Sequence, residues 1–363
     1  MSVKHPVFSR LGSTPQEYEQ LGISRDHIEA REDGMRTDGS KGTFEWWYFD
    51  AALDDGSKLV VTFNTKEVTD AEHALAPYAN VCFDRPDGTK LDTNTPVFVD
   101  DFKASTDGCD VRMGPNTFVG DLHTYDIHVE TDEIVVDVTL VGEVPAWRPE
   151  TGHFLFEKDE HLYFAWLPSV PQGQVKATIA IGGETVTRTG VGYHDHNWGN
   201  CSMLKVIDNW YWGRGQAGPY TVIACLVTAS KRYGLAPFPI FMLAKDGVII
   251  ADDDKKVVFA ESEVHIDEET GKPVGDVLTY DFTDGDASFR VTWKRNETIL
   301  RAKFIDDLHG IEHFAARMIG FDGAYLRFTG DLTIEKLEAG QAVETQKDEA
   351  IWEEMYFGRN HPD

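Results

Sequence analysis

The stretch from Gln174 to Asp195, QVKATIAIGGETVTRTGVGYHD, decides the fold class. Apolar and polar residues alternate on both sides of the Gly182-Gly183 pair. This period of two is typical of β-strands that bury one face. The glycine pair is a turn signal between the two runs. The segment therefore predicts two consecutive β-strands.

Similar strand-like runs of apolar and polar residues continue on both sides of this stretch. TFEWWYFDAAL, DDGS and KLVVTFNTK (residues 43–66) predict one hairpin, and YANVCFD, RPDG and TKLDT (78–93) predict another. Short strands then recur about every 8–15 residues to the end of the chain, which favours antiparallel barrels or sandwiches. Helical patterns are confined to Pro15–Leu21 and to Gly310–Ile319. We predict an all-β protein with few short helices.

The chain length favours two domains. A single core rarely serves 363 residues. The aromatic run at Glu45–Tyr48 is echoed at Asn209–Trp212, and each is followed by a glycine turn and a β-branched strand. We therefore predict an irregular segment (1–40) and two similar β-domains (41–205 and 206–363).

Composition narrows the possible partners and the location. The net charge of −28 makes nucleic acid and anionic membrane surfaces poor partners, although the acidity could simply serve solubility. The four cysteines are widely spaced, which fits a reducing compartment. The N-terminus lacks an apolar signal region, and the apolar stretch Tyr220–Val227 is too short to span a bilayer. We expect a cytoplasmic protein with no integral membrane segment.

The densest group of polar and aromatic residues is GVGYHDHNWGN, residues 190–200. On a continuing strand, Tyr193, Asp195 and Asn197 would point to one face, and His194 and His196 to the other. Ionisable side chains inside a barrel are costly unless they are paired or functional. A purely structural alternative, in which these residues join two sheets, stays open.

Known cofactor and nucleophile motifs are missing from the sequence. His194-x-His196 resembles the start of a cupin metal motif, but Asn197, Trp198, Gly199 and Asn200 follow where a carboxylate is needed. HExxH, GxSxG and a strand-to-helix GxGxxG are also absent. The sequence therefore predicts neither a metal nor a cofactor.

Two aromatic clusters could line a pocket for an apolar molecule. In residues 44–50, Glu45, Trp47 and Phe49 would face one way, and Trp46, Tyr48 and Asp50 the other. Core packing explains such aromatics equally well. In the second cluster, Trp210–Arg214, the cation could pair with an acid of the site or form an ordinary surface ion pair.

These three motifs, EWWYFD, GYHDHNWGN and WYWGRG, resemble those of the carotenoid 1,2-hydratase (hydroxyneurosporene synthase) superfamily. The kievitone-hydratase-like and lipocalin-like Diels–Alderase branches are the most similar. The resemblance covers residues 40–240 and implies two lipocalin-like β-domains with a hydrophobic pocket. Asp195 and His196 match the family's Asp-His pair, but Asn197 stands where carotenoid hydratases have Glu. The aromatic runs at Trp46–Tyr48 and Trp212–Arg214 also match.

The resemblance and the residues together predict an enzyme that needs no cofactor. Its substrate would be an apolar, unsaturated terpenoid or isoprenoid, which is hydrated, dehydrated or cyclised by acid catalysis with Asp195 as the acid. A Diels–Alderase-like pericyclase and a non-catalytic carrier are the alternatives. The sequence leaves the oligomeric state open. The predicted catalytic residues are Asp195, His196, His194, Glu45 and Tyr193, and the predicted substrate-binding residues are Trp46, Trp47, Tyr48, Asn197, Trp198, Trp210, Tyr211, Trp212 and Arg214.

Overall fold

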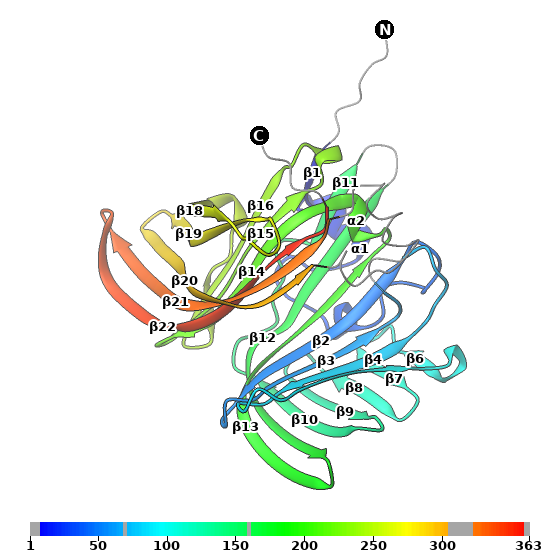
Figure 1. The fold of residues 1–363 in the computed structure, drawn as a ribbon. Helices are drawn as coiled ribbons and strands as arrows, with labels where there is room; N and C mark the ends of the chain where they lie inside the picture. The colour runs from blue at the N-terminus through cyan, green and yellow to red at the C-terminus, as the bar shows by residue number, and fades with distance from the viewer. Residues whose placement is uncertain (1–7, 68–70, 158–160, 304–321, 359–363) are drawn as a thin grey trace. The chain divides into compact units, whose positions relative to one another are not determined.

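The computed structural model describes residues 8–67, 71–157, 161–303 and 322–358, most of them in antiparallel β-strands. The chain divides into two compact units. The N-terminal unit comprises Leu11–Leu155 and Asp159–Ser202, and Met203–Asp363 make up most of the C-terminal unit. Each unit is built on one large curved sheet (Figure 1). The predicted all-β fold is confirmed, whereas the domain limits at residues 40 and 205 stay a prediction.

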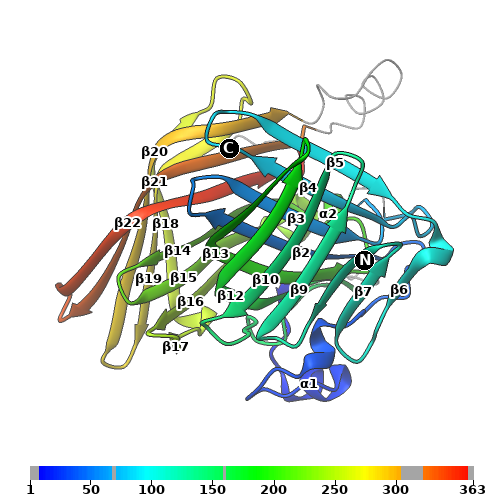
Figure 2. The same ribbon diagram turned by 90° about the horizontal axis from the view of Figure 1, so that it is seen from below.

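The sheet of the N-terminal unit has 13 strands, and Figure 2 shows its central strands side by side. The two predicted hairpins are present as β2–β3 and β4–β5, and β2 also pairs with the distant β13. β1 (Phe8–Leu11) and β11 (His153–Glu157) lie off the main path. The order along the path is β5 (Lys90–Pro96), β4 (Tyr78–Asp84), β3 (Lys58–Asn64), β2 (Phe44–Leu53), β13 (Glu184–Gly199), β12 (Leu162–Ile181), β10 (Ile134–Gly142), β9 (Thr124–Glu130), β8 (Asn116–Gly120), β7 (Cys109–Met113) and β6 (Phe102–Ala104).

The sheet of the C-terminal unit has nine strands, with its own apolar core. The first strand of this sheet along the chain pairs with the next strand in sequence and with the last strand. It therefore lies inside the sheet, between these two strands. The order is β17 (Val248–Ala251), β16 (Pro237–Lys245), β15 (Tyr220–Ala229), β14 (Ile207–Ala217), β22 (Gln341–Tyr356), β21 (Ala324–Glu338), β20 (Ala287–Lys303), β19 (Pro273–Asp284) and β18 (Val257–Ile266).

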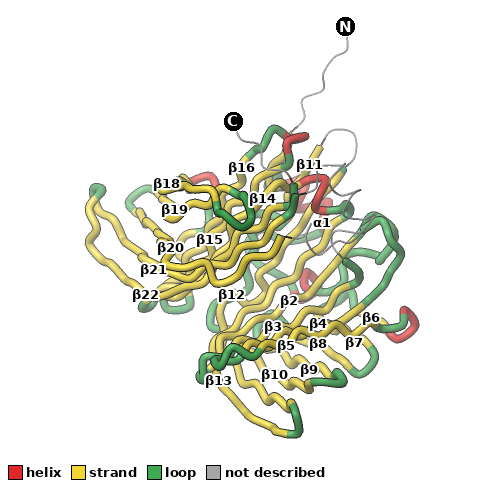
Figure 3. Tube along the Cα trace, in the orientation of Figure 1, coloured by secondary structure: helices red, strands yellow, loops and turns green. Residues whose placement is uncertain are grey.

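Helices are short and lie outside the sheets (Figure 3). The predicted helix at Pro15–Leu21 is present as α1, with a capping box between Thr14 and Glu17 and a left-handed Gly22 at its end. The predicted helix at Gly310–Ile319 lies outside the described residues. Within the described ranges, no helix has the length and hydropathy that crossing a bilayer requires. The other helical segments are α2 (Met203–Val206), η1 (Ala30–Asp33), η3 (Val99–Asp101), η4 (Lys231–Tyr233) and η5 (Asp254–Lys256).

The burial of strand β13 changes along its length. Its first half alternates between exposed and half-buried residues, whereas every residue from Gly192 to Gly199 is buried, so both faces of this part are covered. One face meets the apolar core of the N-terminal unit, where η1 also packs. Gly34 ends η1, and a Cβ there would lie 2.9 Å from backbone atoms of Ser105 and Gly108. This close approach holds the end of η1 against the turn between β6 and β7, and Asp33 contacts β13 through His194.

Candidate functional site

Pairing of β2 with β13 brings two of the three predicted motifs together. Asp195 stands opposite Tyr48, His196 opposite Trp47, and Trp198 opposite Glu45. Directly opposed residues of antiparallel strands share a face of the sheet. The site therefore has two sides, one on each face of the same strand pair, and the predicted alternation of side chains agrees with the structure.

The first side is centred on Asp195, which is 7% exposed. Its Oδ2 accepts hydrogen bonds from Nε1 of Trp166 at 2.8 Å and from the hydroxyl of Tyr193 at 2.7 Å. Its Oδ1 accepts one from Nδ2 of Asn197 at 2.7 Å. Burial raises the pKa of Asp195 to about 6, although these three donors act to lower it. The carboxyl can therefore gain or lose a proton near neutral pH.

Aromatic residues of β2 flank this acid. The ring of Tyr48 meets Tyr193 edge-on at 6.3 Å, and its hydroxyl donates to Asp50 at 3.1 Å. Trp46 stacks on Phe164 with ring centroids 6.2 Å apart. The first side thus combines two buried carboxyl groups, those of Asp195 and Asp50, with several aromatic rings.

The second side holds Glu45 and His196. Nε2 of His196 lies 2.8 Å from Oε1 of Glu45, and the imidazole stacks on Trp47 at 4.7 Å. Both oxygens of Glu45 also accept from the backbone N–H groups of Arg36 and Thr37, at 2.7 and 2.8 Å. Glu45 is fully buried, and its oxygens are bound by protein donors rather than offered to a ligand.

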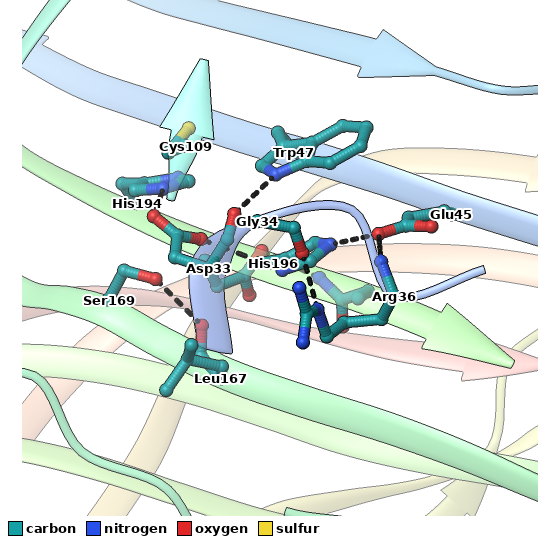
Figure 4. A network of polar contacts seen from close by, with 12 residues as sticks. Asp33, Gly34, Arg36, Glu45, Trp47, Cys109, Leu167, Ser169, His194 and His196 are labelled. Carbon is teal, nitrogen blue, oxygen red and sulfur yellow. Dashed lines mark hydrogen bonds and ion pairs between the residues drawn. The ribbon is translucent and has the colours of Figure 1, made fainter. Parts of the chain in front are cut away.

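His194 and Asp33 complete the second side (Figure 4). Nδ1 of His194 donates to the carbonyl of Tyr48 at 2.8 Å, and Nε2 lies 3.2 Å from Oδ2 of Asp33. The hydroxyl of Tyr125 donates to the same Asp33 oxygen. Burial alone would raise the pKa of Asp33, but the charge and hydrogen bond of His194 outweigh it and hold that pKa below its usual value. Asp33 is therefore an ionised carboxylate inside the unit.

The third predicted motif lies on β14, in the C-terminal unit. Nε1 of Trp210 donates to Glu353 at 3.2 Å, and Tyr325 donates to the same carboxylate at 2.6 Å. Tyr211 is buried in the core of that unit, where its hydroxyl donates to Glu261 at 3.3 Å. Trp212 stands opposite Glu353, and Arg214 follows two residues later on the same strand. These residues thus belong to a different sheet from Asp195.

Three polar or aromatic participants were missed by the sequence reasoning. Asp33 lies in the segment predicted to be irregular, and nothing in its local pattern indicates a site. Trp166 belongs to a predicted strand, but its contact with Asp195 depends on the pairing register of β12. That register shifts on either side of Val170, next to Pro168 and Pro171, which cannot donate to the ladder. Glu353 could have been found from the aromatic and acidic run WEEMY near the C-terminus.

The two curved sheets and the buried polar strand define a lipocalin-like protein, the class that the sequence predicts. Within this class, residues 120–296 match the family described as Diels-Alderase-like. Solved structures share the fold over most of the chain. CghA in complex with Sch210972 has a TM-score of 0.61 at 14% identity and covers 98% of this chain and 100% of its own. Kievitone hydratase from Nectria haematococca has a TM-score of 0.53 at 11% identity and covers 91% and 93%.

Curated relatives match a shorter part of the sequence. The quinolone epoxide rearrangement protein asqO of Emericella nidulans is 26% identical over 50% of this chain and 53% of its own. The hydroxyneurosporene dehydrogenase of Chlorobaculum tepidum is 26% identical over 48% and 53%. The Diels-Alderase ucsH of an Acremonium species is 25% identical over 57% and 55%. The chain thus spans about half the length of the curated relatives it matches, and the predicted family resemblance is confirmed.

Proposed function

We propose that this chain is an enzyme that acts without a cofactor on an apolar, unsaturated terpenoid or isoprenoid of secondary metabolism. The reaction is an acid-catalysed hydration, dehydration or cyclisation. The observation that carries the proposal is the environment of Asp195, a buried carboxyl whose pKa is raised to about 6. A general acid works best with a pKa near the working pH. The relatives named for epoxide rearrangement and Diels–Alder chemistry support an enzyme of this kind.

The hydrogen bonds of Asp195 indicate which oxygen carries the proton. Oδ2 already accepts two donors, whereas Oδ1 accepts only Nδ2 of Asn197 among the described residues. A proton on Oδ1 is therefore the one available to a substrate. In hydration, this proton adds to the alkene and leaves a tertiary cation, which water captures. The oxonium then returns a proton to the carboxylate, so the acid is regenerated.

The aromatic rings on the same face would stabilise the cation. Trp46 and Tyr48 share the face of Asp195, and aromatic faces attract a cation by about 1–2 kcal/mol when water is excluded. Trp47 points to the opposite side, where it stacks on His196. For Trp198, Trp210, Tyr211, Trp212 and Arg214, contact with the substrate stays a prediction.

His194, His196 and Glu45 are assigned a positioning role. A molecule that lies against Asp195 would not touch them, because successive side chains of β13 point to opposite faces. Their contacts instead tie β13 to β2 and to Asp33. This network would hold the strand still while the other face performs the chemistry.

A pericyclase is the second candidate, favoured by the Diels-Alderase-like match over residues 120–296. Such an enzyme folds its substrate and polarises a carbonyl. The single hydroxyl proton of Tyr193 is engaged with Asp195, so Tyr193 could not donate to a carbonyl at the same time. Asn197 uses one N–H on Asp195 and keeps a second for this purpose.

The experiment compares metabolites of a deletion strain complemented with wild type, Asp195→Asn or Asp50→Asn. Asp50 is the matched control, a carboxylate on the same face that accepts from Tyr48. Acid catalysis predicts that the substrate accumulates with Asp195→Asn and not with Asp50→Asn. Normal product levels with Asp195→Asn would favour the pericyclase, and an unchanged metabolite profile in the deletion strain would favour a carrier.

The cellular location belongs to the same proposal. None of the four cysteines, all of which lie in the described ranges, forms a disulfide, which suits a reducing cytoplasm. The expected partner is a hydrophobic small molecule, and the strongly acidic composition disfavours nucleic acid.

A further inference from the structure

Behind the proposed acid, on the other face of β13, three potential metal ligands converge. They are a carboxylate oxygen of Asp33, Sγ of Cys109 and a ring nitrogen of His194, and all three atoms lie within 4.8 Å of one another. Figure 4 shows these side chains gathered beside Trp47 and His196. All three residues are buried, at 2% exposure or less. They come from η1, β7 and β13, so the group is assembled by the fold.

The orientation of both histidines is the one that metal ligands adopt. A ligating histidine usually donates its other ring N–H to a carbonyl or carboxylate, which fixes the ring and leaves the second nitrogen for the metal. In His194, Nδ1 donates to the carbonyl of Tyr48, and Nε2 faces Asp33. In His196, Nε2 is bound to Glu45, and Nδ1 faces Asp33. Two independent rings thus present a nitrogen to one carboxylate.

Polar atoms at the same point lack a partner. Among the described residues, neither Oδ1 of Asp33 nor Nδ1 of His196 forms a hydrogen bond, although both are fully buried and lie 3.6 Å apart. Buried polar atoms are rarely left unsatisfied, because burial removes their hydrogen bonds to water without replacing them. An ion between them would satisfy both atoms.

The spacing suits a small divalent transition metal. Two donors bound to one tetrahedral zinc lie about 3.3–3.8 Å apart. The distance from Nδ1 of His196 to Oδ1 of Asp33, 3.6 Å, lies within this range, and that from Nε2 of His194 to Oδ2 of Asp33, 3.2 Å, lies just below it. Thiolate, imidazole and carboxylate together favour Zn²⁺ or Co²⁺ over Mg²⁺ or Ca²⁺. One thiolate and one carboxylate would balance the two positive charges.

We propose that Asp33, Cys109 and His194, with His196 beside them, form a closed structural site for a zinc-type ion. The ion would join the N-terminal segment to β7 and β13. The site lies on the opposite face from Asp195, so this proposal does not depend on the proposed reaction, whose steps need no metal. It differs from the prediction that His194 and His196 lack a further ligand, because Asp33 and Cys109 come from distant parts of the chain.

The test is refolding of the full chain with Co²⁺, because a closed site would load while the protein folds. We expect one cobalt ion per chain by elemental analysis and a thiolate-to-cobalt charge-transfer band. Cys109→Ser should lose the band, whereas the matched control Cys82→Ser should keep it. At a hundredfold excess over Kd, the metal should raise the Tm of the wild type by about 5 °C or more.

A second variant protects the test against a folding defect in Cys109→Ser. Replacing Cys82, Cys201 and Cys225 with Ser leaves Cys109 as the single thiol, and this protein should still show the band. Wild type that retains no metal, or a band that survives Cys109→Ser or disappears in the single-thiol variant, overturns the proposal. The contact between Asp33 and His194 would then be only a hydrogen bond within the N-terminal unit.

Discussion

The indole of Trp166 donates a hydrogen bond of 2.8 Å to Oδ2 of Asp195, across the pairing of β12 with β13. The two residues are 29 positions apart in the chain. A neutral indole N–H can donate but not accept, so it stabilises the ionised form of the carboxyl. Trp166 therefore opposes the effect of burial and helps to keep the pKa of Asp195 near neutrality.

Replacing Trp166 with Phe should raise the pKa of Asp195 above about 6. The expected rise is about one unit or more, because hydrogen bonds to charged groups are worth about 1.5–3 kcal/mol. Carbon-13 NMR titration of the Asp195 carboxyl measures the shift. Trp147→Phe is the matched control, since Trp147 packs edge-on against Trp166 at 6.0 Å and its Nε1 has no partner among the described residues. An equal pKa shift in both variants would show that the hydrogen bond from Trp166 does not lower the pKa of Asp195.

Replacing Asp195 with Asn should lower kcat about 10²–10⁴-fold with little change in KM if Asp195 is the proton donor. The fold should tolerate the change, because the amide oxygen can accept from Trp166 and Tyr193 while the side chain of Asn197 turns to accept from the new NH₂ group. Activity and thermal melting are measured on the same sample. A strongly lowered Tm with normal turnover would instead assign Asp195 a structural role.

The pH dependence of the unfolding free energy should give a second, independent measure of the raised pKa of Asp195. Its pKa is about 6 in the folded protein and 3.8 in a model carboxyl, so the folded state holds the proton more tightly. The resulting stabilisation is complete below pH 3.8 and is lost as the pH rises through about 6, by about 3 kcal/mol in all. Asp195→Asn removes this dependence. Melting curves of both proteins between pH 4 and 8 should therefore show the wild type losing stability relative to the variant, and parallel curves would exclude the shift.

Replacing Asp33 with Asn should destabilise the N-terminal unit by about 1–3 kcal/mol, because a neutral amide would replace the buried carboxylate that accepts from Tyr125 and lies 3.2 Å from Nε2 of His194. Since the pKa of Asp33 lies below its usual value, its contribution is present at neutral pH and is lost as the pH falls through the folded pKa. Urea denaturation at pH 7 measures the change. The exposed Asp26→Asn serves as control and should change stability by less than about 0.5 kcal/mol.

Local sequence patterns predicted much of the fold and the faces on which the side chains of β13 lie. Period-two alternation located the hairpins and assigned Asp195 and His194 to opposite faces, since those assignments need only the strand geometry. The partners of these residues could not be found in this way. Asp33 reaches His194 because η1 folds back onto the sheet, and Trp166 reaches Asp195 because β12 shifts register near Pro168. Both contacts depend on tertiary packing, which one sequence does not reveal.

The burial of β13 on both faces limits which changes of length the protein can tolerate. Inserting or deleting one residue between Gly192 and Asp195 would rotate every later side chain to the other face, so Asp195 and His196 would exchange surroundings. A change of two residues would preserve the faces and move the groups along the strand by about 7 Å. Length variation among distant relatives should therefore avoid this segment and accumulate at the Gly182-Gly183 turn, where an added Cβ would meet nothing within 4 Å.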